Sequence, residues 1–242
     1  MFALVRKEIT GFLGSLIGHI VIVVFLLITG LFLWVFPDNL LDQGYADLAP
    51  LFGLAPWVFL FLVPAITMRS ISEERRTGTL EILLTKPLTE LQVVLAKYLA
   101  SVLLVAVALL PTLVYWYTVS DLAMPQGNVD TGGILGSYIG LLFLAACFVA
   151  VGIFASALTE SQIVAFLIAV FLCFFLYLGF ELLADFSTFG GLEGAVRRLG
   201  IQEHYMSMSR GVIDLRDALY FVGVIGIFLL LTRTVLQSRT WS

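Results

Sequence analysis

Long apolar stretches separated by short polar segments set the pattern of this chain. A helix needs about 20 mostly apolar residues to cross the hydrocarbon core of a membrane. Six stretches meet or approach that length, and each predicts a membrane-spanning helix: residues 17–36, 51–68, about 99–117, 134–158, 163–180 and 218–236. The pattern therefore predicts an all-α, polytopic membrane protein whose residues 1–242 form a single transmembrane domain.

The composition agrees with this pattern. Hydrophobic residues make up 60% of the chain and charged residues only 12%, whereas about a quarter of the residues in a soluble globular protein are charged. Membrane lipids are therefore the expected surroundings of most of the chain. A net charge of −4 excludes binding to polyanions by bulk charge, so we expect no nucleic-acid partner.

Capping patterns predict where three helices begin. A Ser or Thr followed three residues later by Glu or Gln is typical of a helix start. The pairs are Thr89 with Gln92, Thr159 with Gln162 and, as a weaker acidic variant, Asp214 with Asp217. A chain break is expected at Lys86-Pro87, because the residue before a proline is pushed out of helical geometry. The helix that starts at Thr89 should then run on through the third span.

The placement of Lys and Arg predicts the orientation. With the N-terminus in the cytoplasm, nine of the 13 basic residues lie on the inner side, as the positive-inside rule favours. The loops 37–50 and 118–133 then lie outside, with five Asp and no basic residue. Segment 181–217 is also external and carries the other four Arg; we expect short interfacial or re-entrant helices there. Six spans return the C-terminus to the cytoplasm.

The polar segment 69–98, between the second and third predicted spans, is the most informative part of the chain. Within it, residues 72–84 place charged side chains on one helix face and apolar side chains on the other. The triplet Thr77-Gly78-Thr79 is expected either to break this helix or to let another backbone approach closely. Such a helix can lie along the membrane surface, insert its apolar face into a partner, or merely solvate the connection. The pattern leaves these alternatives open.

Two polar strings resemble ABC-2 type permeases, the membrane subunits of a class of ATP-binding-cassette exporters. They are EERRTGTLEILLTKPLTELQVVLAK in segment 69–98 and SMSRGVIDLRDALYF at residues 207–221. The N-terminal KEI and the runs LAPWVFLFLVPAITMRS and SQIVAFLIAVFLCFF resemble more closely the gliding-motility-associated permease subunits. The resemblance covers essentially the whole chain. It implies a permease subunit of an ATP-driven export complex in a bacterial inner (cytoplasmic) membrane.

The resemblance also implies which segments meet partners. Segment 1–14 would be an amphipathic connector helix at the cytoplasmic face. The helix after the second span would be the coupling helix that sits on an ABC ATPase subunit. The implied ATPase-coupling residues are Glu73, Glu74, Arg75, Arg76, Thr77, Gly78, Thr79 and Glu81. Six spans make half a transporter in this family, so a second permease subunit is implied. In gliding-type systems that subunit is a different chain, which makes the complex heteromeric.

The sequence contains no GxxxxGK[ST] phosphate-binding loop. We therefore expect this chain to bind no cofactor and to be no enzyme, with ATP and Mg²⁺ used by the separate ATPase. We also expect no metal site. A Cu(I) site at His204, Met206 and Met208 is an alternative to an apolar patch on the external segment. Pro56, Pro64 and Pro111 mark either hinges or fixed kinks inside spans.

Three functions remain open from the residues. The first is the ATP-driven export permease. The second is a non-transporting membrane anchor that transmits ATPase-driven motion to envelope partners. The third is a proton-coupled carrier, for which Glu181 and Asp185 would be the candidate relay because they are four apart on one helix face. The same two carboxylates are alternatively a solvated lip at the external end of a pathway.

Overall fold

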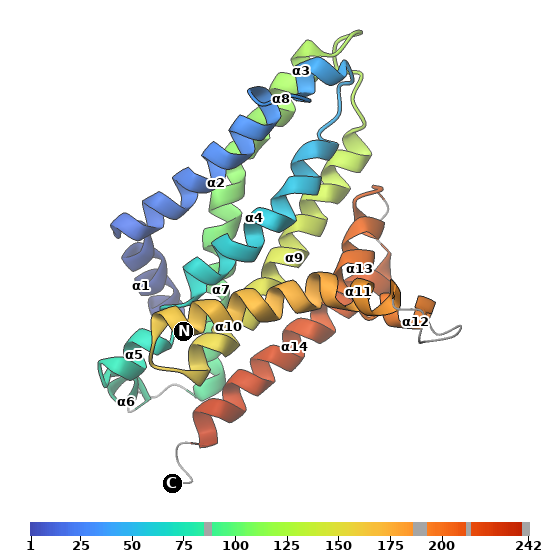
Figure 1. Ribbon diagram of the computed structural model, residues 1–242. Coiled ribbons are helices and arrows are strands. Elements are labelled where there is room, and N and C mark those ends of the chain that lie inside the picture. The colour runs from blue at the N-terminus through green and yellow to red at the C-terminus, as the bar shows by residue number, and fades with distance from the viewer. Residues whose placement is uncertain (85–88, 186–192, 212–213, 239–242) are drawn as a thin grey trace.

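The computed structural model describes residues 1–84, 89–185, 193–211 and 214–238, without the side chains of Ile82 and Leu84. Every regular element in these ranges is a helix (Figure 1). Six helical stretches within them are long and apolar enough to cross a membrane: Leu16–Trp34, Ala49–Arg76, Glu90–Leu122, Thr131–Leu158, Gln162–Asp185 and Leu215–Gln237. Each coincides with one of the six predicted spans, so the all-α, polytopic architecture is confirmed.

Three of these stretches are single helices and three are composite. The first, fourth and sixth are α2 (Leu16–Trp34), α9 (Thr131–Leu158) and α14 (Leu215–Gln237). The other three contain a break or a change of pitch. They comprise α4 (Ala49–Thr67) with α5 (Ser72–Arg76), α7 (Glu90–Leu109) with α8 (Leu113–Leu122), and α10 (Gln162–Phe174) with α11 (Phe180–Asp185). Pro111 lies in the 3-10 turn between α7 and α8, because proline has no N–H to continue the α-helical ladder.

Helix α9 forms the centre of the bundle and packs against α4, α7, α10 and α14. Within its most apolar window 78% of the residues are buried, against 22% in the corresponding windows of α2 and α14. A helix that is apolar on all sides belongs in a core. The peripheral helices expose apolar faces instead, as expected for surfaces that meet lipid or another membrane subunit.

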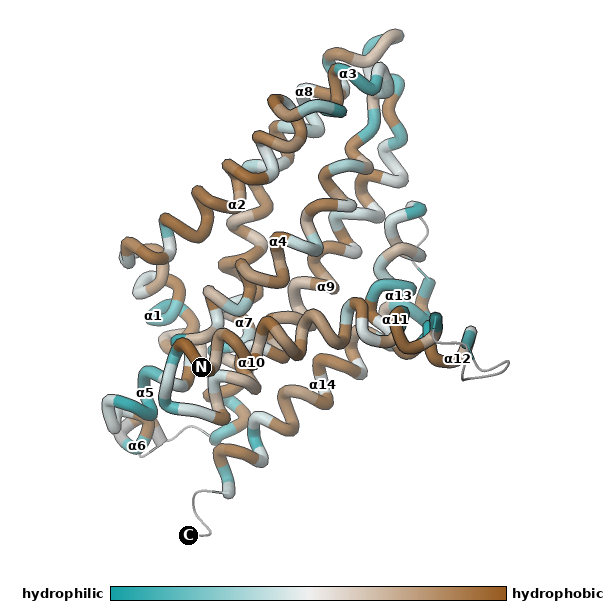
Figure 2. The backbone as a smooth tube through the Cα atoms, viewed as in Figure 1, coloured by the Kyte–Doolittle hydropathy of each residue, from teal (hydrophilic) through white to brown (hydrophobic). Residues whose placement is uncertain are grey.

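The remaining helices lie at the ends of the spans. Helix α1 (Phe2–Leu13) packs on α7, and α6 (Thr79–Leu84) follows α5. Helices α1, α5 and α6, the N-terminus and the end of α14 all lie at one end of the bundle (Figure 1). Helix α3 (Leu40–Gln43) and the end of α8 lie at the opposite end, and α12 (Glu193–Arg197) and α13 (Ile201–Met208) lie between α11 and α14. Figure 2 shows hydrophilic residues gathered on these end segments and hydrophobic residues along the spans.

The predicted helix starts have different outcomes. At Thr89 both hydrogen bonds of the capping box are present, with Thr89 Oγ1 accepting from Gln92 N at 3.3 Å and Gln92 Oε1 accepting from Thr89 N at 3.1 Å. The box predicted at Thr159 is wrong. Thr159 ends α9, and Ser161 caps α10 by accepting from Val164 N at 3.5 Å. Ser161, which the capping pattern did not single out, directly precedes the first residue of α10, Gln162.

The prediction of an acidic capping pair at the start of α14 is half right. Asp214 accepts a hydrogen bond from Arg216 N at 3.0 Å and caps the helix. Asp217 does not complete a box with it, because its carboxylate faces His204 in α13. The predicted break at Lys86-Pro87 lies outside the described residues.

Candidate functional site: the elbow between α4 and α7

One side chain of α9, Ser156, positions the turn that joins α4 to α5. Ser156 Oγ accepts hydrogen bonds from Ile71 N and Ser72 N, both at 3.0 Å, and donates to Met68 O at 3.0 Å. The first N–H groups of a helix have no partner within that helix. The buried hydroxyl of Ser156 therefore supplies an acceptor where α5 begins and holds the turn against the core helix.

Helix α5 ends at a glycine in the left-handed region. Gly78 has a φ of 68°, and a Cβ built on it would meet no atom within 4 Å. The sequence left open whether Gly78 breaks the helix or lets another backbone approach. The described surroundings show only the break, because the space around it is empty. Helix α6 then starts at Thr79, whose hydroxyl lies 2.9 Å from the hydroxyl of Thr77.

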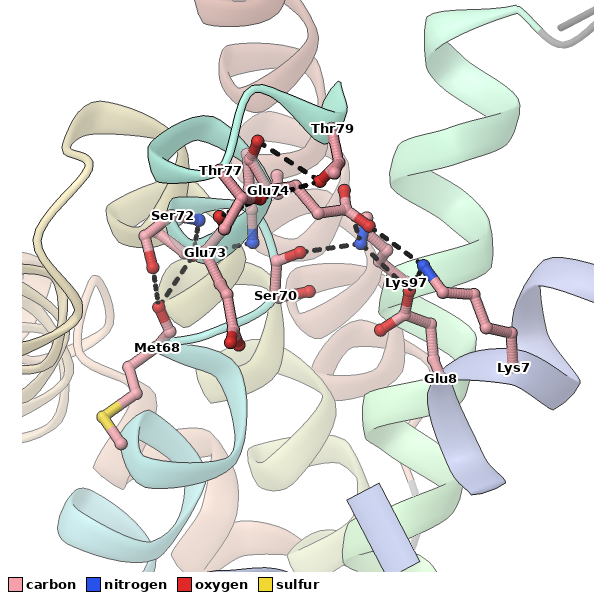
Figure 3. A network of polar contacts seen from close by, with 12 residues as sticks. Lys7, Glu8, Met68, Ser70, Ser72, Glu73, Glu74, Thr77, Thr79 and Lys97 are labelled. Carbon is pink, nitrogen blue, oxygen red and sulfur yellow. Dashed lines mark hydrogen bonds and ion pairs between the residues drawn. The ribbon is translucent and has the colours of Figure 1, made fainter. Parts of the chain in front are cut away.

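A buried lysine joins this elbow to its neighbours. Lys97 of α7 places its Nζ 3.1 Å from Glu8 Oε1 of α1, 3.0 Å from Glu74 Oε2 of α5 and 2.7 Å from Ser70 O (Figure 3). Its side chain is 0% exposed. An ammonium group has three N–H donors: here it donates to Glu8 Oε1 and Ser70 O, and it forms an ion pair with Glu74 Oε2. The ammonium of Lys97 therefore links α1, α5 and α7.

Lys7 extends the same cluster toward the surface. Its Nζ lies 3.3 Å from Glu74 Oε1 and 3.7 Å from Glu8 Oε1. Burial lowers the pKa of the Lys7 ammonium, but the two carboxylates raise it by more, so the net shift is upward from the usual value. Lys7 therefore stays charged at neutral pH. We call Lys7, Glu8, Glu74 and Lys97 the lysine cluster.

Two further ion contacts hold α5 in place. Arg75 donates a hydrogen bond from Nη1 to Ala157 O, in the last turn of α9. Carbonyl groups at a helix C-terminus lack partners in the helix and favour a positive charge. On the same segment, Arg69 Nε lies 3.3 Å from Glu73 Oε2, one helical turn apart. Arg75 thus connects the elbow directly to the central helix.

The structure separates the eight predicted coupling residues into two groups. Glu73, Glu74 and Arg75 are engaged by other side chains or backbone of this chain. The others are exposed and form the turn between α5 and α6 with the start of α6. We call this exposed group the elbow tip: Arg76, Thr77, Gly78, Thr79 and Glu81. Expectations for all eight as ATPase contacts came from the resemblance alone; the geometry leaves the elbow tip free for a partner.

The predicted pair Glu181 and Asp185 lies in the short helix α11, with Glu181 in its first turn and Asp185 at its end. Asp185 Oδ1 lies 2.6 Å from Arg197 Nη2 of α12, and this hydrogen bond raises the pKa of the guanidinium above its usual value. Both side chains of that ion pair are at least half exposed. Glu181 makes no polar contact with Asp185 among the described residues. The arrangement resembles a solvated rim more than a paired proton relay.

The structure contains a buried pair of a histidine and an aspartate that the sequence did not predict. His204 Nδ1 lies 2.7 Å from Asp217 Oδ1, its Nε2 lies 2.9 Å from Arg198 O, and its ring stacks on Tyr220 at 3.9 Å. These contacts join α13 to α14. Both imidazole nitrogens are occupied, Met206 is exposed and Met208 is buried. The three residues considered for Cu(I) therefore do not converge on one point.

Lys97 and Ser156 are the functional residues that sequence reasoning missed. Lys97 did carry a signal, because it is the single charge in the apolar run from Val93 to Leu110. An ionisable side chain inside an apolar helix demands a partner. Ser156 carried no comparable signal, since small polar residues are common in membrane helices. Its role depends on where α9 meets the end of α4.

Comparison with known protein families identifies a matching family. A family model described as ABC-2 family transporter protein matches residues 35–192, which is more than half of the chain. The matched range contains α5, α6 and most of the spans. A search of curated proteins finds no match.

Proposed function

This chain belongs to the ABC-2 family of transporter proteins, and from that premise we propose that it is the permease subunit of an ATP-driven export complex whose elbow tip docks on the ATPase. The family places the chain as a transmembrane component and implies a separate ABC ATPase partner. Use of ATP and Mg²⁺ by that partner, and the lack of a cofactor in this chain, are parts of the proposal.

The division of the elbow into a free tip and an anchored base is the observation that carries the proposal. The tip offers charged and hydroxyl side chains to a partner. Directly beneath it, Glu74 is held by Lys97 of α7, and Arg75 is held by Ala157 O of α9. A displacement of the tip would therefore act on the ends of two spans and on α1. This is the geometry that a coupling element requires.

The proposed mechanism is a rigid-body transmission. ATP binding closes two ATPase subunits, the elbow follows, and the attached ends of α7 and α9 rock relative to the other spans. A partner shifts a conformational equilibrium only by the difference in its contacts with the two states. We therefore place the energetic coupling in contacts of the elbow tip that differ between the open and closed ATPase.

The finer assignments are proposals from charge and resemblance. The excess of Lys and Arg on the side of α1, α5 and α6 supports a cytoplasmic elbow and cytoplasmic termini in a bacterial inner membrane. The resemblance of several strings to gliding-motility-associated permeases supports that type of system. In it, the second permease would be a different chain and the complex heteromeric.

A non-transporting anchor is the second candidate, and the packing around α9 is the observation that favours it. At the centre of the bundle, α9 contacts buried apolar side chains of α4, α7, α10 and α14. An export path would then have to run between this chain and a second permease. If no such path forms, the same elbow would only transmit ATPase-driven motion to envelope partners.

Site-specific crosslinking tests the docking role. A photoreactive amino acid is placed at Arg76 or Glu81 in the elbow tip, and at the exposed Gln126 at the opposite end as a control. In membranes of the native host, the two tip positions should crosslink to a protein with an ATP-binding cassette, and Gln126 should not. Crosslinks to such a protein from Gln126 alone would sink the proposal.

Truncation of one tip side chain gives a quantitative test. Arg76→Ala should weaken association with the ATPase by about tenfold, because truncating a central interface arginine often costs more than 1 kcal/mol. The matched control is Arg216→Ala, which removes the same side chain from an exposed position near the start of α14. Association is measured with the purified complex by titration, and ATP hydrolysis is followed in parallel. Equal affinities for both variants would contradict a docking tip.

A further inference from the structure

A cleft of about 420 Å³ lies beside the lysine cluster, between α1, the end of α4, the elbow and α7. This volume is within the range of pockets that bind small molecules. It is lined by both charged and apolar groups: Lys7, Glu8, Gly11, Phe12, Ser15, Ile66, Arg69, Ser70, Glu73, Glu74, Thr77, Thr79, Ala100, Ser101 and Leu104. Neither the export function nor the ATPase contact requires such a cleft.

The charges of the cleft are of both signs. Lys7 and Arg69 bring two positive charges, and three glutamates bring three negative charges. The ammonium of Lys97, which contacts Glu8 and Glu74, adds a third positive charge, so the surroundings of the cleft are close to neutral. An occupant that carries one negative and one positive group matches this lining better than a plain anion does.

Hydrogen-bond donors in the cleft remain unused. The only ion pair of Arg69 runs through Nε, to Glu73 at 3.3 Å, and its two terminal nitrogens have no partner among the described residues. The hydroxyl of Ser101 has no partner there either, although the residue is only 6% exposed. Arg69 and Ser101 both line the cleft, and a guanidinium fork is a favourable partner for a phosphate group.

Part of the cleft wall is apolar. Phe12, Ile66 and Leu104 line it from three different helices. Gly11 faces open space, because a Cβ built there meets no atom within 4 Å. The cleft also lies where α4 and α7 reach the end of the apolar spans, the depth at which lipid headgroups are found. A lining that combines charged and apolar side chains at that depth suits an amphipathic molecule.

We propose that this cleft binds the headgroup of a zwitterionic phospholipid of the phosphoethanolamine class. Its phosphate lies against Arg69 and Ser101, its ammonium group faces the carboxylates around Lys7, and its first acyl carbons contact Phe12, Ile66 and Leu104. The bound lipid fills the space between α1 and the base of the elbow. It thereby stabilises the elbow in the position that the lysine cluster sets. This inference does not depend on which cargo, if any, the protein exports.

Native mass spectrometry of the full-length protein in detergent tests the site. The protein is titrated with a phosphoethanolamine lipid and with a phosphoglycerol lipid of identical acyl chains. Gly11→Leu plugs the cleft without a clash and without changing any charge, and leucine favours a helix more than glycine does. Its matched control is Gly223→Leu in α14, where a Cβ also meets no atom. Arg69→Gln removes the phosphate ligand, with Arg216→Gln as its control.

The wild-type protein and both controls should retain the phosphoethanolamine lipid more strongly than the phosphoglycerol lipid. Arg69→Gln should weaken that retention by roughly tenfold, the loss expected when one charge-assisted hydrogen bond is removed. Gly11→Leu should weaken it by a similar factor because the leucine side chain occupies part of the cleft. Equal retention by Gly11→Leu and Gly223→Leu overturns the site. Stronger binding of the phosphoglycerol lipid overturns the headgroup. Displacement of the lipid by free phosphoethanolamine at equal concentration overturns the lipid source and assigns the cleft to a soluble zwitterion.

Discussion

At the scale of single residues, Lys97 is the most constrained side chain of the elbow. Lysine is almost never fully buried without a partner, and here two carboxylates from other helices and one carbonyl oxygen surround its ammonium. Breaking a buried ion pair by removing one partner is strongly destabilising, because the other charge is left without compensation. Each of these acceptors is contributed by a different segment, so their alignment around Lys97 reports the position of the whole elbow.

Lys97→Met keeps the length of the side chain but removes the buried cation between Glu8 and Glu74, leaving them only the exposed Lys7. It should lower the free energy of unfolding by about 3 kcal/mol. The matched control is Lys7→Met. Lys7 belongs to the same cluster but its side chain is 65% exposed, and a surface pair contributes only about 0–1 kcal/mol. Thermal unfolding in detergent measures both. Equal losses for the two variants would contradict the buried role of Lys97.

At the scale of elements, the contact between α4 and α9 depends on a missing side chain. Gly152 of α9 faces Thr67 of α4, whose Oγ1 donates to Val63 O at 2.9 Å. A Cβ built on Gly152 would lie 2.0 Å from Thr67 Oγ1 and 2.9 Å from Thr67 Cβ. The close approach also sets the position of Ser156, one helical turn further along α9, against the start of α5. The packing of α4 against α9 therefore determines the position of the elbow.

Gly152→Ala should push α4 and α9 apart and destabilise the fold by about 1–3 kcal/mol, as overpacking of a core typically does. Gly223→Ala on the exposed side of α14 is the control, and it should be neutral or stabilising by up to about 1 kcal/mol through helix propensity. Adding Thr67→Ala to Gly152→Ala removes the nearest clashing atom and should recover part of the loss. Unfolding curves for Gly152→Ala, Thr67→Ala, Gly223→Ala and the double variant of Gly152→Ala with Thr67→Ala measure this coupling. Additive losses in the double variant would show that the two residues do not meet.

At the scale of the whole molecule, the spans of the described residues differ in burial, with α9 the most buried and the peripheral spans exposing apolar faces. Helix α9 is enclosed, while α2, α10 and α14 each bury less than a third of their apolar windows within this chain. Helices α1, α5 and α6 and the end of α14 share one end of the bundle (Figure 1). In the proposed complex, a partner docked on the elbow tip would therefore also lie close to α1.

The topology is open to direct labelling. Cys147 and Cys173 are both 0% exposed, so the native thiols should not react with a membrane-impermeant maleimide. Thr77→Cys in the elbow tip should then be labelled only in inside-out vesicles, and Gln126→Cys only in intact cells or right-side-out vesicles. Mass spectrometry of the labelled protein provides the measurement. Labelling of Thr77→Cys from outside would invert the orientation and remove the ATPase contact.

Local chemistry accounts for the parts of the fold that were predicted. The spans follow from run length alone, because lipid demands about the same apolar length from each of them. The start of α7 follows from Thr89 and Gln92, since a capping box uses atoms only three residues apart. The break at Gly78 follows in the same way from a residue that readily adopts positive φ. At the start of α10 the pattern selected Thr159, but the cap is Ser161, two residues further along the chain.

The candidate site could be located along the chain but not resolved into its parts. The charged run placed the elbow between the second and third spans, and the resemblance named eight residues in it. Which of them are free for a partner depends on Glu8 of α1, Lys97 of α7 and Ser156 of α9, which are distant in sequence. Such contacts are long-range, and no local pattern encodes them. Hydropathy and capping residues determine where the helices form, whereas packing between α4, α7 and α9 determines which side chains of the elbow remain exposed.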